Sequence, residues 1–208
     1  MYTRLKNNSI QTPWNKGKFV GQKPLLKLPE IWAIRIHLRI EARHRDLALF
    51  NLAIDSKLRA CDLLRLRVSD VSNGGRITPR AVVLQQKTQR PVQFEITPQT
   101  RDAISAWIRF ASLGASEFLF PSRLDRSNHV SRRQYARIVE SWVTRIGLDS
   151  AVYGTHSLRR SKASLIYRRT KNLRAVQLLL GHAKLDSTIR YLGIEVEDAL
   201  ELAELTEV

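Results

Sequence analysis

Residues 156–193 read HSLRRSKASLIYRRTKNLRAVQLLLGHAKLDSTIRYLG, and this stretch decides the fold. Apolar residues recur along it at helical intervals, and Gly181 suits the left-handed end of a helix. We expect short helices at about 157–169, 172–180 and 186–192. Four polar groups follow one another along these helices, an imidazole, a guanidinium, a second imidazole and a phenol: His156, Arg159, His182 and Tyr191.

These four side chains carry the groups that phosphodiester cleavage without a metal requires. An arginine offers two parallel donors to a phosphate and keeps its charge. Histidines donate to the phosphate or move protons, and a tyrosine can attack it. A phenol has a pKa of about 10, so Tyr191 needs positive neighbours or a base. Arg159 lies three residues after His156, so both face the same way on a helix.

At these residues the chain resembles the tyrosine recombinase (phage integrase) family. The signature of that family is a His-x-x-Arg box, a Gly-His pair and a tyrosine nine residues after the second histidine. The resemblance implies that Tyr191 attacks the scissile phosphate and keeps a 3′-phosphotyrosyl bond while a 5′-hydroxyl departs. It implies that His182 bonds the phosphate and supports the tyrosine. It covers about residues 30–195, and therefore the catalytic domain.

The resemblance also supplies the upstream half of the site. The family has an arginine that opens a helix with an acidic residue three positions on, which Arg59 and Asp62 match, with Asp62 orienting rather than reacting. Arg65 and Arg67 compete for this role but lack the acid at that offset. The family places a lysine on a β-hairpin near the leaving group. Lys87 is expected to be that general acid, with Arg90 in the same turn as the alternative.

The remaining periodicity predicts a mainly α fold with one small antiparallel β-sheet (α+β), the tyrosine recombinase catalytic-domain fold. Strands are expected at 81–87 and 91–96, with a third that could begin at Ile77. Further helices are expected at about 29–43, 45–56, 59–66, 98–111, 131–146 and 195–206. The expected organisation is a basic arm at 1–28, a catalytic domain at 29–194 and an acidic C-terminal helix at 195–208.

The charge of the chain points to a polyanion as its partner. Thirty-five Lys and Arg against 19 Asp and Glu give a net charge of +16, and nucleic acid is the commonest polyanion. No Lys or Arg follows Arg190, whereas six of the acids do, so residues 1–190 carry +22. We expect double-stranded DNA on the basic part. We expect the acidic helix to dock on a neighbouring protomer in a dimer-to-tetramer assembly on DNA.

The DNA-contacting residues are expected on the arm and on two other surfaces. Lys16 and Lys18 lie in an arm without acids, where aromatic residues beside cations suit a nucleic-acid backbone. A tail that only aids solubility is the alternative. Arg160 points away from Arg159 on a helix and is expected to contact the DNA backbone, as is Arg90.

No cofactor is expected from this sequence. Five scattered histidines and one cysteine lack zinc spacing, and no Gly-rich phosphate loop is found. Cys61 cannot form an intrachain disulfide and is expected to be a buried structural thiol. No stretch is apolar enough to span a bilayer, so a cytoplasmic, nucleoid-associated protein is expected. The family's usual upstream DNA-clamping domain is missing, so an accessory DNA-binding protein is a candidate partner.

The function implied is that of a minimal tyrosine recombinase, similar to the fimbrial phase-switch invertases. It would break and rejoin duplex DNA at specific sites in integration, excision or inversion, without metal or ATP. Two alternatives remain open at this point: a non-catalytic DNA-binding regulator on the same fold, and a type IB topoisomerase-like relaxing enzyme. A covalent adduct on DNA separates enzyme from regulator, and product topology separates recombination from relaxation.

Overall fold

The structure is a computed structural model that describes residues 23–194 and Glu204. The expected catalytic domain, residues 29–194, therefore lies entirely within the described range. Lys16 and Lys18 and nearly all of the acidic segment lie outside the described residues. The expectations for the arm contacts and for the helix at 195–206 remain predictions.

The described residues are mainly helical, as expected. The helices are α1 (Leu28–Ile40), α2 (His44–Ser56), α3 (Ala60–Leu64), α4 (Val68–Val71), α5 (Pro98–Ala111), α6 (Arg132–Arg145), α7 (Thr155–Thr170), α8 (Leu173–Leu180) and α9 (Leu185–Leu192). The strands are β1 (Ser72–Asn73), β2 (Arg76–Ile77), β3 (Arg80–Leu84) and β4 (Pro91–Glu95). The fold class, mainly α with small antiparallel sheets, is confirmed.

The expectation of one sheet was wrong, because the strands form two separate antiparallel hairpins. Ile77 belongs to the first hairpin and pairs with Ser72. Pro79 follows and has no N–H for a ladder, so β2 does not continue into β3. In the second hairpin β3 pairs with β4 along the whole length of both strands, and Arg80 lies opposite Glu95. β3 also stops earlier than expected, since the backbone N–H of Gln85 already closes the connecting turn.

Capping residues set where the C-terminal helices begin. α7 starts two residues earlier than expected, and the Ser157 hydroxyl accepts from the Gly154 N–H at 3.1 Å. His156 therefore lies in the first turn of α7. Asn172 caps α8 by accepting from the Ala175 N–H at 2.9 Å, as short polar side chains do at helix starts.

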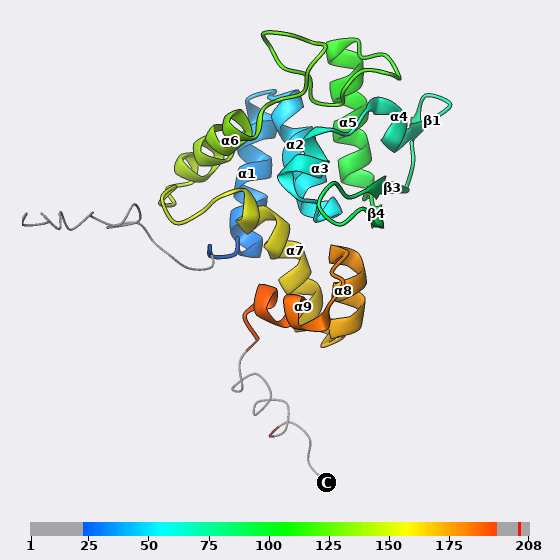
Figure 1. The fold of residues 1–208 in the computed structure, drawn as a ribbon. Helices are drawn as coiled ribbons and strands as arrows, with labels where there is room; N and C mark the ends of the chain where they lie inside the picture. The colour runs from blue at the N-terminus through cyan, green and yellow to red at the C-terminus, as the bar shows by residue number, and fades with distance from the viewer. Residues whose placement is uncertain (1–22, 195–203, 205–208) are drawn as a thin grey trace, which may run out of the picture.

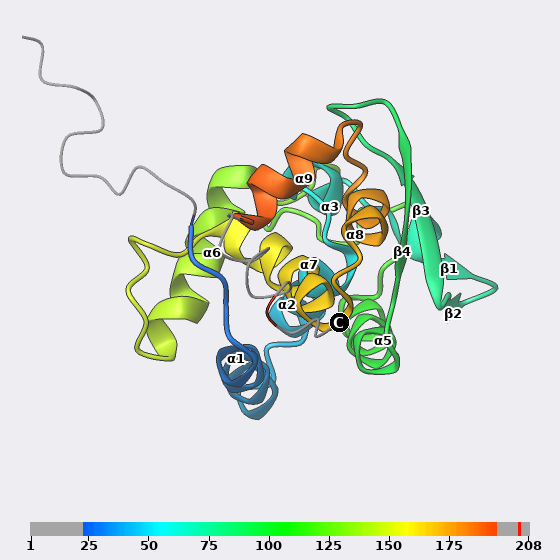
Figure 2. The same ribbon diagram turned by 90° about the horizontal axis from the view of Figure 1, so that it is seen from below.

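Two regions pack around separate cores (Figure 1). We call α1–α6 with the four strands the body, and its core surrounds α2, where Leu49, Phe50 and Leu52 are fully buried. We call α8 and α9 the C-terminal layer. The layer packs on the second half of α7 around Val176 and Leu180. In Figure 2 the layer covers one end of α7, and α8 also contacts β4.

The described end of the predicted arm packs on the domain. Leu26 is buried, and its N–H donates to the Ser161 hydroxyl of α7 at 2.9 Å. The chain just before α1 is thus part of the folded unit. Among the described helices, none combines the length and the apolar character needed to cross a membrane.

Candidate active site

Three of the predicted catalytic residues line one pocket of about 620 Å³: Arg59, Lys87 and His156. Arg59 immediately precedes α3, Lys87 lies in the turn between β3 and β4, and His156 lies in the first turn of α7. The other lining residues are Ala60, Cys61, Arg65, Gln86, His129, Arg132 and Thr155. The fold thus joins three distant parts of the chain in one cavity.

The pocket is built for an anion. Its lining includes four side chains that are cationic at neutral pH, Arg59, Arg65, Lys87 and Arg132, together with two histidines, and none of its described lining residues is acidic. A concave surface with one sign of charge concentrates counter-ions of the other sign. Within the described residues no group of three or more His, Cys, Asp or Glu could hold a metal ion.

Asp62 connects α3 to the turn that carries Lys87. Its side chain is buried, and Oδ1 accepts from the Gln86 N–H at 2.9 Å. This contact agrees with the orienting role expected from the resemblance. Arg67 does not line this pocket. Its guanidinium lies 4.5 Å from the centre of the Phe118 ring and donates to the Ser116 carbonyl.

The other three predicted residues form a second group beside the pocket. The Tyr191 ring lies edge-on to the His182 ring with 5.3 Å between centres, and the Arg159 guanidinium is 5.6 Å from the tyrosine ring centre. Arg159 is buried, with Nη2 donating to the Leu180 carbonyl at 3.0 Å. The predicted six therefore divide into a pocket group and a tyrosine group.

Gln85 connects the two groups, and the sequence analysis missed it. Its Oε1 accepts from Arg59 Nη1 at 2.7 Å, and its Nε2 donates to the Leu180 carbonyl at 3.2 Å. That carbonyl also accepts from Arg159. Both arginines are thus fixed to one buried amide and one helix-end carbonyl. A glutamine beside a predicted hairpin turn gives no signal in the sequence, because its partners come from distant segments.

Gly181 allows this close approach. Its φ is +66°, in the left-handed region that glycine adopts without strain. A Cβ atom there would lie 2.4 Å from Val92 Cγ2 and 3.0 Å from the Gln85 amide. The glycine of the Gly-His pair therefore brings the layer directly against the β3–β4 hairpin.

The environment keeps the Tyr191 phenol protonated. Burial raises the pKa of Tyr191 to about 12, although Arg159, Arg160 and Arg59 lower it in part. The hydroxyl oxygen is buried, while the residue as a whole is half-buried. Attack by Tyr191 at neutral pH therefore requires transfer of its proton during the reaction.

Both predicted histidines are neutral at pH 7. Burial, followed by the charges of Arg159 and Arg59, lowers the pKa of His182 to about 4. Burial and the nearby arginines also lower the pKa of His156. His182 Nδ1 lies 3.1 Å from the Thr188 hydroxyl, which fixes the direction of the ring. A phosphodiester anion between these rings would raise the pKa of both histidines.

Arg160 is buried rather than exposed on a surface, so the contact with the DNA backbone expected for it stays a prediction. Its side chain is 7% exposed, it donates to the Lys23 carbonyl at 2.6 Å, and it lies 5.7 Å from the Tyr191 ring centre. Neighbouring residues on a helix do point in different directions, but α9 and the chain before α1 cover this side of α7. Arg160 is therefore an inner part of the tyrosine group. Arg90 is exposed beside the hairpin turn.

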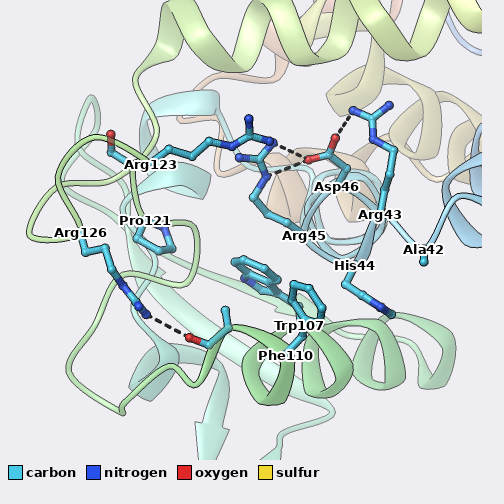
Figure 3. Close-up of a pocket in the computed structure, with 12 residues that line it drawn as sticks. Ala42, Arg43, His44, Arg45, Asp46, Trp107, Phe110, Pro121, Arg123 and Arg126 are labelled. Atoms are coloured by element: carbon cyan, nitrogen blue, oxygen red, sulfur yellow. Dashed lines mark hydrogen bonds and ion pairs between the residues drawn. The ribbon is translucent and has the colours of Figure 1, made fainter.

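A second pocket, of about 600 Å³, lies at the other end of α2 (Figure 3). Trp107 and Phe110 of α5 line it, and the His44 ring lies 4.9 Å from that of Phe110. Arg43 and Arg45 also line it but are both paired with the buried Asp46. This pocket contains none of the predicted site residues, so we place the candidate active site at the Arg59 end of α2.

The fold is that of known recombinase catalytic domains. The chain superposes on the XerA recombinase with a TM-score of 0.71 and 17% identity, over 88% of this chain and 64% of that one. It superposes on the XerH site-specific recombinase in a pre-cleavage complex with difH substrate with a TM-score of 0.70 and 20% identity, over 90% of this chain and 56% of that one. The class defined by fold and site is the tyrosine recombinase catalytic domain.

The sequence comparisons identify the family. The sequence model of the phage integrase family matches residues 30–197. The probable integrase/recombinase YoeC of Bacillus subtilis is 30% identical over 181 residues, which cover 87% of this chain and 94% of YoeC. The tyrosine recombinase XerC of Haemophilus influenzae is 31% identical over 160 residues, which cover 76% of this chain and 52% of XerC. The chain belongs to the phage integrase family; it spans nearly all of YoeC and about half of XerC.

Proposed function

We propose that this chain is a site-specific DNA recombinase that cleaves and rejoins duplex DNA through a 3′-phosphotyrosyl intermediate. The observation that carries the proposal is the position of Tyr191, whose ring centre lies 5.3 Å from that of His182 and within 5.7 Å of two guanidinium groups. Membership of the phage integrase family and the recombinase relatives support it. The structure of XerH with its difH substrate supports DNA as the partner.

In the proposed reaction Tyr191 Oη attacks the phosphorus and the bond from phosphorus to the 5′-oxygen breaks. Arg59 and Arg159 hold the phosphate and neutralise the charge that develops on its oxygens. Lys87 gives a proton to the departing 5′-oxygen. His182 and His156 bond the phosphate, and a neutral imidazole can accept the phenol proton. The phosphotyrosyl bond retains the energy of the phosphodiester, so a new 5′-hydroxyl can reverse the step without ATP.

Neither alternative class is favoured. A DNA-binding regulator has no need of a tyrosine placed beside a histidine and two arginines. A relaxing enzyme would share the chemistry, and the topology of the products separates it from a recombinase. Self-association on DNA and an accessory DNA-binding protein remain parts of the proposal.

The decisive test is trapping of the covalent adduct. A binding site is first enriched from a random duplex pool, and a nicked version of it is then used as a suicide substrate. We expect an adduct that maps to Tyr191 and is lost in Tyr191→Phe, with a DNA dissociation constant within about twofold of wild type because one hydroxyl is removed. Tyr167→Phe, in the last turn of α7, removes the same hydroxyl group from another tyrosine and is the matched control. An adduct that persists in Tyr191→Phe refutes the proposal.

The acidic segment 195–208 is proposed to join neighbouring protomers on DNA. It holds six acids and no Lys or Arg, together with an apolar stripe that a solvated tail does not need. Truncation after Gly193 should preserve binding to a single half-site and abolish cooperative binding to paired half-sites in a gel-shift titration. Cooperative binding by the truncated chain would show that the segment serves its own domain.

A further inference from the structure

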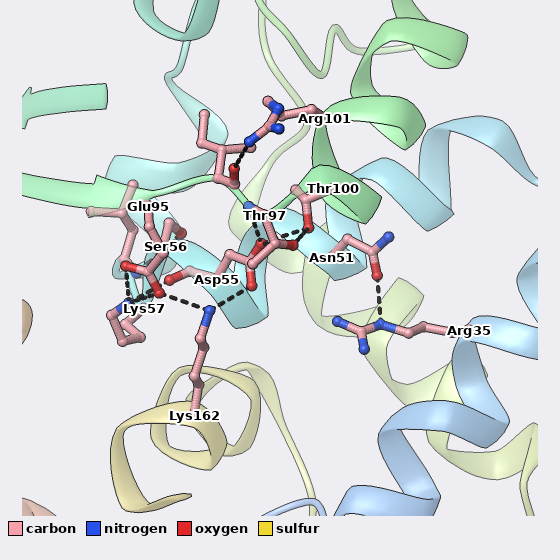
Figure 4. A network of polar contacts seen from close by, with 12 residues as sticks. Arg35, Asn51, Asp55, Ser56, Lys57, Glu95, Thr97, Thr100, Arg101 and Lys162 are labelled. Atoms are coloured by element: carbon pink, nitrogen blue, oxygen red, sulfur yellow. Dashed lines mark hydrogen bonds and ion pairs between the residues drawn. The ribbon is translucent and has the colours of Figure 1, made fainter. Parts of the chain in front are cut away.

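Four charged side chains meet at the end of α2 and form what we call the charged cluster: Asp55, Lys57, Glu95 and Lys162 (Figure 4). Lys162 Nζ lies 2.7 Å from Asp55 Oδ1 and 2.7 Å from Glu95 Oε1. Lys57 Nζ lies 2.9 Å from both Glu95 oxygens. Two cations and two carboxylates thus neutralise one another, and none of the four residues has a role in the proposed reaction.

Two members of the cluster are buried, whereas the side chains of Lys162 and Glu95 are 22% and 36% exposed. Asp55 is 2% exposed and Lys57 1% exposed. The second oxygen of Asp55 accepts from the Thr97 N–H at 3.0 Å and from the Thr97 and Thr100 hydroxyls at 2.7 and 2.6 Å. Burying an ion is energetically costly, and packed apolar residues often stabilise a fold as well as a buried ion pair does. Stability alone is therefore a poor explanation for the two buried charges, Asp55 and Lys57.

Lys57 adopts a backbone conformation that glycine would adopt more readily. Its φ is 54°, in the left-handed region, which is unfavourable for a residue with a side chain. This residue ends α2 and turns the chain toward Arg59, two residues later. The ion pair with Glu95 holds the turn against β4. A strained turn and a buried cation coincide immediately before a predicted catalytic arginine.

The cluster joins the three segments that form the candidate site. Lys162 lies on α7, about one turn after Arg159, although it pairs with Asp55 107 residues earlier in the sequence. Glu95 ends β4 of the hairpin whose turn carries Lys87. A displacement of any one segment would break a contact within the cluster. The distances among the catalytic groups therefore depend on it.

We propose that Asp55, Lys57, Glu95 and Lys162 are positioning residues that set Arg59 and Arg159 relative to each other and to the Lys87 hairpin. This inference rests on the proposed function, which the Tyr191→Phe test decides separately. None of the four is proposed to touch DNA. Loss of a cluster contact should therefore slow formation of the adduct without weakening binding of DNA.

The main variant is Lys162→Met, which keeps the length of the side chain and removes its charge. In single turnover at saturating suicide duplex, we expect the adduct rate to fall about tenfold to a hundredfold, the range for small misplacements of reacting groups. The DNA dissociation constant should change less than about twofold, since no phosphate contact is lost. Arg109→Met, which removes one exposed cation from α5, is the charge-matched control and should react as wild type.

Two further variants separate positioning from stability. Lys57→Gly relieves the strained backbone while removing the ion pair, so we expect it to unfold no more easily than wild type and still to react slowly. Lys162→Arg keeps the charge and should recover most of the rate lost in Lys162→Met. Rates are compared at a temperature where circular dichroism shows each variant folded. The inference is overturned if folded Lys162→Met and Lys57→Gly form adduct at the wild-type rate.

Discussion

The body and the C-terminal layer divide the proposed catalytic groups between two very different cores. Arg59 and Lys87 belong to the body, whose core extends from α1 to α6 and reaches Leu158 of α7. His182 and Tyr191 belong to the layer, which packs on α7 around a smaller cluster; among the described residues its fully buried members are Ala163 of α7 and Val176 and Leu180 of α8. Regions with few buried apolar contacts open at lower free energy than the main core. The phosphate-binding side is thus expected to be rigid and the tyrosine side easier to displace.

The seam between the two regions includes polar contacts and one close backbone approach. On the body side it is Gln85, and on the layer side it is the Leu180 carbonyl followed by Gly181. Arg159 bonds the same carbonyl from α7. Correct placement of Tyr191 thus depends in part on these hydrogen bonds and on this close backbone approach.

The seam can be broken most directly at Gly181. Gly181→Ala places a Cβ atom 2.4 Å from Val92 Cγ2 in addition to the strain of the left-handed backbone. We expect the adduct rate to fall by about a hundredfold or more, because misplacement of reacting groups has effects of this size. Single-turnover trapping measures it. Gly147→Ala is the matched control, since φ there is +77° and nothing lies within 4 Å, and it should react nearly as wild type.

The difference between the cores can be measured with a pair of leucines. Leu49 in the body and Leu180 in the layer are both fully buried. Leu→Ala at such sites costs about 2–5 kcal/mol. For Leu49→Ala we expect this loss in the global free energy of unfolding by urea. For Leu180→Ala we expect hydrogen exchange to accelerate mainly in α8 and α9. Equal global losses in both variants would contradict the division into two regions.

The smallest predicted effect is on the pH dependence of stability. The pKa of His182 falls from its ordinary 6.5 to about 4 on folding, so the folded state excludes a proton that the unfolded chain binds. The stability from the neutral ring is complete above pH 6.5 and is lost as the pH falls toward 4. In His182→Gln the free energy of unfolding should fall less over this pH range, by on the order of 1 kcal/mol. The effect is this small because solvent screens a half-buried ring. Urea unfolding of wild type and His182→Gln across this pH range measures the difference.

The sequence predicted local features well and long-range contacts poorly. The helix bounds from α5 to α9 follow from capping residues and helical periodicity, so they were confirmed to within two residues. The grouping of Arg159, His182 and Tyr191 was predictable because their spacing follows a known signature. Gln85 was not, since its role comes from partners 26 and 95 residues away. The burial of Arg160 was not predicted because a helical wheel does not show which neighbouring elements cover each face.

Cys61 gives this chain a practical property. It is the single cysteine, and it is half-buried in the pocket wall beside Arg59 rather than buried in the core as expected. Burial and the neighbouring Asp62 raise the pKa of the thiol, so thiol reagents should couple to it slowly at neutral pH. Any label that does attach sits where the phosphate is proposed to bind. The chain thus carries one natural attachment point for a fluorophore or cross-linker whose coupling rate reports directly whether the pocket is empty or filled.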